Sequence, residues 1–328
     1  MTSVSAPVVG IDLGGTKALA GVVEADGRVR SRVWLPSRDL YGRPAELLDR
    51  LAAGASAAAR DAGVAFESIE AVGVCVPGPL DPSRTIVAVT PNLGWEDLAV
   101  RDELERRLPG VSVFVENDVR AAALSEHQWG AGRGYQSMLA VFVGSGVGGG
   151  LVVDGRLYHG AHGGAGEIGH IVVRSGGPRC GCGRAGCLEA MAARDAVGRY
   201  VRQEVARGHT TLLTEILHGD LGAFTSRDLA TAVTHGDWVA IRAARRSARY
   251  TGLAIGGMVN LFDPAVVVIG GGIAEALGDR YVEWAAELTR RQILASSARD
   301  LPIVASRLGD DAGLLGAGLT AFAGLAAG

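Results

Sequence analysis

The chain has 328 residues, 48% of them hydrophobic and 20% charged, so it is long enough for two hydrophobic cores. Its 32 basic and 35 acidic residues leave a formal net charge of −3, which favours neither nucleic acid nor an anionic membrane as a partner. No stretch has the pattern of an export signal or a membrane span, so we expect a cytoplasmic protein that acts on a small molecule. The 49 glycines are unusually many and direct attention to glycine-rich loops.

The first half of the chain alternates strand-like and helix-like segments. Residues 8–15 (VVGIDLGG) form a short apolar run that ends in glycines, and in residues 19–33 the pair Asp26-Gly27 separates two further strand-like runs. This pattern predicts a strand, a glycine loop and a tight hairpin. Residues 45–63 then show helical periodicity, and buried strands are predicted at 70–76 and 111–117.

The same order recurs in the second half. Residues 137–150 (SMLAVFVGSGVGGG) lead into residues 151–158, where Asp154-Gly155 again separates two strand-like runs, and a buried strand is predicted at 265–271. We therefore predict two α/β domains related by internal duplication.

Both halves place glycine loops where a phosphate group could bind. Successive backbone N–H groups line a concavity for phosphate oxygens, and glycine lets the backbone approach closely. Such glycines can also serve only to make sharp turns. Gly144, Gly146 and Gly149 fit the dinucleotide pattern G-x-G-x-x-G, which leaves a nicotinamide-dependent dehydrogenase as the other enzyme class. That pattern should open a helix, however, and here it runs into a predicted strand.

Three of the four cysteines lie close together. Cys180, Cys182 and Cys187 follow His170, and one imidazole with three thiolates suits a tetrahedral structural zinc site. Four protein ligands leave no open position, so such a zinc would shape a loop and would not activate water. The alternative is a set of unligated buried thiols. Cys75, alone in a strand-like run, is interpreted as a core residue.

Several motifs in a fixed order resemble the ROK family of sugar kinases, repressors and open reading frames, from about residue 8 to the C-terminus. They are DLGGTK (12–17), PGPLD (77–81), PNLGW (91–95), ENDVRAAALSE (116–126), GSGVGGG (144–150), GEIGH (166–170), CGCGRAGCLE (180–189) and VVVIGGGI (266–273). The resemblance implies two duplicated actin-like (ribonuclease H-like) ATPase domains with an interdomain cleft. The expected domains are a smaller one over residues 1–118 and a larger one over 119–311, with a C-terminal helix at about 312–328 packing back on the first.

The resemblance also implies the residues of a kinase site. ATP and Mg²⁺ are the expected cofactors beside a structural Zn²⁺, with Asp12 helping to hold magnesium through water. The phosphate loops and the nucleoside pocket would contain Gly14, Gly15, Thr16, Lys17, Gly144, Ser145, Gly146, Gly271 and Gly272. The sugar would be bound by Gly78, Asn92, Asn117, Asp118, Glu167, His170 and Glu189.

Asp118 is the candidate catalytic base. Phosphoryl transfer to an alcohol needs a group that accepts the hydroxyl proton, and Asp118 follows a predicted strand at the edge where open α/β sheets bind ligands. Asn117 or Asp118 can instead cap the helix-like segment that follows, and both roles can coexist. For Glu167 and Glu189 the alternative is plain surface exposure. His159 and His162 are interpreted as loop histidines.

We therefore predict an ATP-dependent hexokinase that phosphorylates O6 of glucose. N-acetylmannosamine, fructose, allose or an amino sugar remain alternative acceptors, because recognition of the sugar hydroxyls depends on loop geometry. Val119, Arg120 and Ser125 depart from the residues common in the family, and Arg120 bears on which sugar fits. A sugar-sensing regulator without strong catalysis is the other reading. Only about seven residues precede the first strand, so a DNA-binding module is not expected. The family suggests a homodimer or homotetramer.

Overall fold

The computed structural model of this chain describes residues 6–327. They divide into two compact units. Unit 1 contains the described residues up to Gly130, the segment Arg156–Ala165 and the residues from Asp310 onward, and unit 2 contains Ala131–Gly155 and Gly166–Gly309. Residues 1–5 and 328, which the predicted domains include, lie outside the described part. None of the helices within residues 6–327 is long and apolar enough to cross a membrane.

Unit 1 is built on a mixed sheet with the strand order β3-β2-β1-β4-β7. The first three strands pair antiparallel, and β1, β4 and β7 run parallel to one another. Two short strands form a separate antiparallel pair. The strands are β1 (Val8–Leu13), β2 (Lys17–Val23), β3 (Val33–Pro36), β4 (Ala71–Val76), β7 (Ser112–Asn117), β5 (Val87–Thr90) and β6 (Trp95–Leu98).

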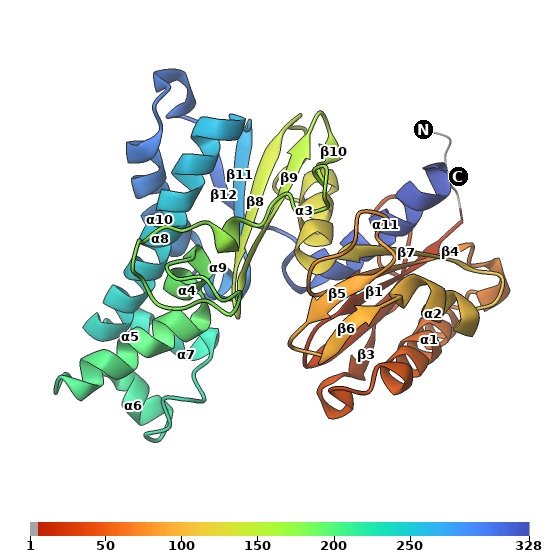
Figure 1. The fold of residues 1–328 in the computed structure, drawn as a ribbon, viewed down its shortest axis with the longest axis horizontal. Helices are drawn as coiled ribbons and strands as arrows, with labels where there is room; N and C mark the ends of the chain where they lie inside the picture. Colours follow the sequence, from red (N-terminus) through yellow and green to blue (C-terminus); the bar gives the residue numbers. More distant parts are fainter. Residues whose placement is uncertain (1–5, 328) are drawn as a thin grey trace. The chain divides into compact units, whose positions relative to one another are not determined.

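Helices pack on the sheet of unit 1 (Figure 1). They are α1 (Pro44–Asp61), α2 (Val100–Arg107), α3 (Asp118–Gln128) and α11 (Ala312–Ala327). Helix α1 agrees with the predicted helix and begins with Pro44, which is favourable at a first helical position. Its buried residues recur at helical spacing, with Leu47, Leu48 and Leu51 facing the sheet, and this one apolar stripe fixes how the helix docks.

Glycines let α11 approach the sheet and α3 closely. A Cβ atom on Gly73 of β4 would lie 1.8 Å from the carbonyl oxygen of Ala317, and one on Gly316 would lie 2.1 Å from the carbonyl oxygen of Ala121. Any side chain at these two positions would collide with backbone. The boundary expected after residue 118 falls after the first residue of α3, whereas the whole of α3 groups with unit 1, where it packs on α11.

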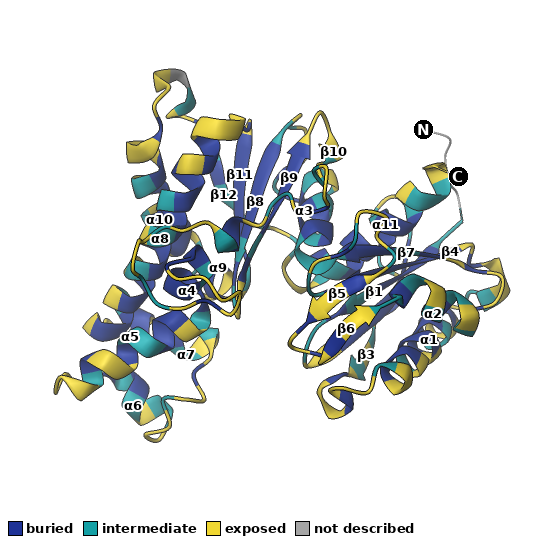
Figure 2. Ribbon diagram, viewed as in Figure 1, coloured by how far each residue is buried: buried dark blue, intermediate teal, exposed yellow. Residues whose placement is uncertain are grey.

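Unit 2 repeats the arrangement of unit 1. Its strand order β9-β8-β11-β12 matches β2-β1-β4-β7, with an antiparallel first pair and parallel pairs beyond it. In Figure 2 the strands of both sheets are largely buried. This repetition confirms the duplicated α/β fold. The strands are β8 (Met138–Val143), β9 (Val147–Val153), β11 (Val266–Gly270) and β12 (Ile303–Ala305), and the two-residue β10 (Arg156–Leu157) follows the Asp154-Gly155 turn.

Helices supply most of the remaining core of unit 2. The long helix α8 packs against α10, α5 and α4, while α9 contacts β8 and β11. Residues 171–187 between β9 and α4 contain no helix and only isolated β-bridges, which is the region of the clustered cysteines. The helices are α4 (Leu188–Ala192), α5 (Arg194–Ala206), α6 (Leu212–Ile216), α7 (Ser226–Thr234), α8 (Trp238–Phe262), α9 (Gly272–Leu277) and α10 (Asp279–Gln292).

One of the two predicted hairpins forms as expected, and the other is less regular than predicted. Asp154 and Gly155 both have positive φ angles and join β9 to β10 directly, as the sequence predicts. After Asp26-Gly27 the chain makes only one bridge, between Val23 and Val29, and β3 does not begin until Val33. Gly149 lies inside β9, so the G-x-G-x-x-G pattern does not open a helix.

Candidate functional site

Two carboxylates meet at one edge of the unit 1 sheet. Asp12 lies near the end of β1, and Asp118 begins α3 directly after β7. The strand register pairs Asp12 with Cys75 and Cys75 with Glu116, so Asp12 is level with Glu116, and Asp118 lies two residues beyond Glu116 at the end of a parallel strand. This is the carboxyl edge at which open α/β sheets bind ligands.

Burial raises the proton affinity of both aspartates. Burial, with a further contribution from the charge of Asp12, raises the pKa of Asp118 to about 7. Burial also raises the pKa of Asp12 to about 6, although attraction to Lys17 opposes the rise. Asp118 is therefore poised to exchange a proton near neutral pH, which is what a general base requires.

Asn117 holds Asp118 in place and caps the helix that follows. Its Oδ1 accepts hydrogen bonds from the backbone N–H groups of Val119 and Arg120, both at 3.1 Å. Its Nδ2 donates to Oδ1 of Asp118 at 2.9 Å and to the carbonyl oxygen of Gly78 at 3.2 Å. The capping role weighed in the sequence is present, and it coexists with the orientation of the carboxylate.

A buried ion network behind Asn117 was missed in the sequence. Glu116 is 1% exposed, and its Oε2 lies 2.7 Å from Nε2 of His159 and 3.2 Å from a guanidinium nitrogen of Arg84. Its Oε1 accepts the N–H of Asn117 at 2.9 Å. Burial alone would raise the pKa of Glu116, but the hydrogen bond from His159 and the charge of Arg84 lower it below its ordinary value. His159, interpreted as a loop histidine, therefore has a defined partner.

Arg120, which departs from the residues common in the family, has a place in this part of the fold. Its side chain is 2% exposed and donates to the carbonyl oxygen of Gly163. Together with the contact between His159 and Glu116, this bond attaches the segment Arg156–Ala165 to α3 and β7 within unit 1. A long side chain at position 120 was visible in the sequence, but its partner is far away along the chain.

The first glycine loop turns between β1 and β2. The N–H of Gly14 bonds to the carbonyl oxygen of Lys17 at 3.0 Å, and a Cβ on Gly15 would lie 2.9 Å from Cβ of Asn92. Thr16 and Lys17 are exposed, and Nζ of Lys17 lies 3.9 Å from the ring centre of Trp34. Unit 1 thus brings this loop together with Asn92, while Gly78 lies beside Asn117.

Unit 2 brings the other glycines together. The N–H of Gly144 bonds to the carbonyl oxygen of Gly146 at 2.9 Å, and Ser145 is exposed at the tip of this turn. A Cβ on Gly144 would lie 3.4 Å from the backbone nitrogen of Gly272. Gly271, with φ of +85°, passes so close to Val143 that no side chain would fit.

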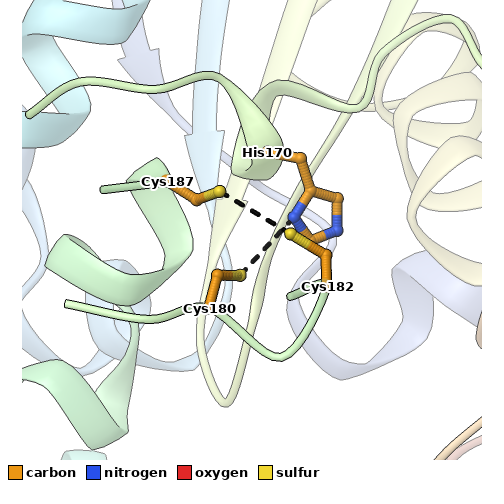
Figure 3. A group of neighbouring side chains, drawn as sticks. All are labelled: His170, Cys180, Cys182 and Cys187. Carbon is orange, nitrogen blue, oxygen red and sulfur yellow. Dashed lines mark hydrogen bonds between the residues drawn. The ribbon is translucent and has the colours of Figure 1, made fainter. Parts of the chain in front are cut away.

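The four predicted metal ligands converge (Figure 3). Their ligand atoms lie within 4.8 Å of one another, with Cys180 Sγ 3.7 Å from His170 Nδ1 and Cys182 Sγ 3.7 Å from Cys187 Sγ. Zinc–sulfur bonds of about 2.3 Å at tetrahedral angles place ligand atoms about 3.7 Å apart, so this arrangement fits a zinc ion. The facing nitrogen is Nδ1, so Nε2 of His170 is left for another partner.

The thiols of the cluster differ in acidity. The backbone N–H of Arg184 is the main cause that lowers the pKa of Cys182 to about 6, whereas burial raises the pKa of Cys180 to about 12. A divalent cation would favour the thiolate form of all three sulfurs.

Glu189 connects the cysteine cluster to the second glycine loop. Its Oε2 accepts the N–H of Val147 at 3.1 Å, and its Oε1 accepts the thiol of Cys180 at 3.4 Å. Its side chain also lies beside Gly146, where a Cβ would be 2.7 Å from Oε2. Glu167 is exposed and directly precedes the 3-10 turn Ile168–His170, so one short turn carries both Glu167 and His170.

Known proteins are similar to this chain over nearly its whole length. The model of the ROK family matches residues 8–323. The chain belongs to the ROK family. This ROK protein is 35% identical over 317 residues to a glucokinase of Thermotoga maritima, with 94% of this chain and 95% of that protein covered.

Two solved ROK structures are similar to this ROK protein over nearly their full length. A ROK hexokinase from Thermus thermophilus is 40% identical with a TM-score of 0.81, covering 98% of this chain and 100% of that one. A ROK family glucokinase from Streptomyces griseus, solved with glucose and AMPPNP, is 32% identical with a TM-score of 0.85, covering 97% and 99%. These likenesses confirm the two-domain actin-like ATPase fold predicted from the motifs.

Proposed function

We propose that this protein is an ATP-dependent sugar kinase that transfers the γ-phosphoryl group of ATP to the 6-hydroxyl of glucose. The observation that carries the proposal is the position of Asp118, a largely buried carboxylate at the carboxyl end of the parallel strands of unit 1 with a pKa of about 7. The similarity to glucokinases, one of them solved with glucose and an ATP analogue, supports ATP and glucose as the substrates.

In the proposed reaction, a carboxylate oxygen of Asp118 accepts the proton of the sugar hydroxyl. The bond from O6 to the γ-phosphorus forms while the bond from that phosphorus to the bridging oxygen breaks, and ADP leaves with the electron pair. Hydrogen bonds from Asn117 and from the N–H of Val119 hold Asp118 in one orientation, both at 2.9 Å. A base fixed in this way contributes roughly 10²- to 10⁴-fold in rate.

The glycine loops of the two units are proposed to bind the phosphates. Gly14, Gly15 and Thr16 in unit 1 and Gly144–Gly146 in unit 2 present backbone N–H groups, and Gly271 and Gly272 serve the nucleoside. Lys17 and Asp12 complete this set, and Asp12 would hold Mg²⁺ through water. Magnesium supplies neutralisation of the phosphate charges when it is bound.

A structural zinc ion is proposed at His170, Cys180, Cys182 and Cys187. It would tie the turn that carries Glu167 to the loop that precedes Glu189, so that both carboxylates and Nε2 of His170 meet sugar hydroxyls in a fixed geometry. The free thiols agree with the reducing cytoplasm as the location. A homodimer or homotetramer is the assembly that we propose.

The experiment is an assay of ADP release with a panel of hexoses and amino sugars. We expect the highest kcat/KM with glucose and a product phosphorylated at O6. N-acetylmannosamine, fructose and allose are the acceptors that compete with this proposal, and a higher kcat/KM for one of them would replace glucose. Sugar binding without ADP release from any of the panel would indicate a sensor in place of a kinase.

A further inference from the structure

A polar cavity lies in unit 2, and none of its lining residues is among those assigned to phosphoryl transfer. Its volume is about 330 Å³, in the range of small-molecule sites. Arg174, residues 176–178 and residues 190–191 form part of its wall, and the other lining residues come from α5 and α8. Three arginines line it, namely Arg174, Arg199 and Arg246, and none of the lining residues is acidic.

Two of these arginines are held in place by other contacts. The guanidinium of Arg246 lies 5.6 Å from the ring centre of Tyr200 and 5.2 Å from that of Tyr250. One nitrogen of Arg199 donates to the carbonyl oxygen of Ala190 at 2.7 Å. Contacts of this kind reduce the side-chain entropy that a ligand would otherwise have to overcome.

The positive charge at the cavity is not compensated by the protein. Across residues 6–327, no carboxylate forms an ion pair with Arg174, Arg199 or Arg246, although many other arginines of the chain have such a partner. Guanidinium groups bind phosphate oxygens through paired hydrogen bonds. Three arginines that line one cavity without an ion-paired carboxylate therefore favour an anion with several oxygen acceptors.

We propose that this cavity binds a phosphate-bearing small molecule, either a phosphomonoester such as a sugar phosphate or free phosphate itself. The shared chemistry is a phosphate dianion held by Arg199 and Arg246, with Arg174 closing one side. Tyr200 and Gln203 on the same lining provide groups that can contact an attached polyol.

The position of the cavity connects it to the sugar-binding residues, and this part rests on the proposed function. Residues 176–178 lie between the zinc ligands His170 and Cys180 along the chain, and Ala190 and Met191 directly follow Glu189. An anion bound to both of these walls would restrict the loop that holds the cysteine cluster. We therefore expect its binding to change the KM for the sugar more than kcat.

The test is calorimetric titration of the zinc-loaded protein with inorganic phosphate and, separately, with glucose 6-phosphate. Glucose and AMPPNP are kept saturating so that the kinase site is filled. Arg199→Gln and Arg246→Gln each remove one charged hydrogen-bonding group, and we expect them to weaken binding roughly 10- to 100-fold. Arg245→Gln is the matched control, because Arg245 is on the same helix and also contacts an aromatic ring, that of Trp284 at 5.1 Å, but does not line the cavity.

The possible results test three points separately: whether the cavity binds an anion, whether that binding changes the sugar KM, and whether the protein is a kinase. Absence of heat with both anions, or equal weakening by Arg245→Gln and Arg246→Gln, overturns the site whether or not the protein is a kinase. Tighter binding of glucose 6-phosphate than of phosphate identifies an ester as the ligand, and the reverse order identifies the free ion. Binding that leaves the sugar KM unchanged in the wild type overturns the coupling. Unfolding temperatures check that each variant is folded.

Discussion

Replacing Asp118 by asparagine is expected to stabilise the free protein while it removes most of the catalytic activity. Asparagine has nearly the same shape, and its Oδ1 can still accept the hydrogen bonds from Asn117 and Val119. It carries no charge, however, and the aspartate charge is disfavoured in the folded state. Burial is the main reason, and the charge of Asp12 adds to it.

The size of the gain follows from the pKa. The pKa of Asp118 rises from its ordinary value of 3.8 to about 7 on folding. Each tenfold change in proton affinity corresponds to about 1.4 kcal/mol, so the full difference has an upper limit of about 4 kcal/mol. Some contact with solvent reduces this difference, and we expect on the order of 2 kcal/mol, or roughly 4–8 °C in unfolding temperature.

The raised pKa also predicts how the stability difference between Asp118→Asn and the wild type depends on pH. Because the pKa of Asp118 is higher in the folded state, the wild type keeps its full stability below pH 3.8, where the carboxyl group is protonated in both states. It loses stability as the pH rises to about 7 and the buried group ionises. The advantage of Asp118→Asn over the wild type should therefore grow between about pH 4 and 7 and level off above. Thermal unfolding in EDTA at several pH values measures it, with Asp154→Asn as an exposed control within about 0.5 kcal/mol of the wild type. An advantage that is independent of pH would refute the assigned ionisation.

The remaining predictions concern catalysis, the metal and the packing. The value of kcat/KM should rise with pH through about 7, because Asp118 must be ionised to accept a proton, and a flat profile from pH 5 to 9 would contradict this. Cys182→Ser should lose zinc, measured by elemental analysis, because the three remaining ligands do not complete a tetrahedral site. The sugar KM should then rise. Gly73→Ala should destabilise unit 1 by about 3 kcal/mol, since its Cβ would meet the backbone of α11. Glu116→Gln should cost roughly 3 kcal/mol and lower kcat, whereas the exposed His162→Gln should change neither.

Controls for the glycine and cysteine predictions come from the same chain. Gly257 in α8 has open space around it, so Gly257→Ala should be neutral or stabilising, and a loss equal to that of Gly73→Ala would rule out the steric explanation. Cys75→Ala should retain zinc, because Cys75 is buried in β4 apart from the cluster. Normal sugar affinity in metal-free protein would refute the positional role of zinc.

Much of the candidate site could be predicted because its chemistry lies in short stretches of sequence. The cysteines and His170 are within eighteen residues of one another, and a short loop with many glycines has few ways to separate them. The strand before Asp118 alternates, so its end and the cap formed by Asn117 follow from local pattern alone.

Contacts between distant segments could not be predicted in this way. Glu116, Arg84 and His159 are separated by 32 and 43 residues, and no local pattern indicates that they form one network. Glu189 was expected at the sugar, but its bonds to Val147 and Cys180 depend on how the loop of the cysteine cluster folds back on β9.

The sequence by itself determined the duplicated order of strands and glycine loops, the ligand set of the cysteine cluster and the carboxylate that follows β7. These features depend on periodicity and spacing, which local backbone geometry enforces. Only the tertiary structure decided that the charge of Asp12 adds to the raised pKa of Asp118, that Arg120 reaches Gly163 and that three arginines line one cavity. Charge interactions and close packing depend on distance in space, and distance in space is set by the whole fold.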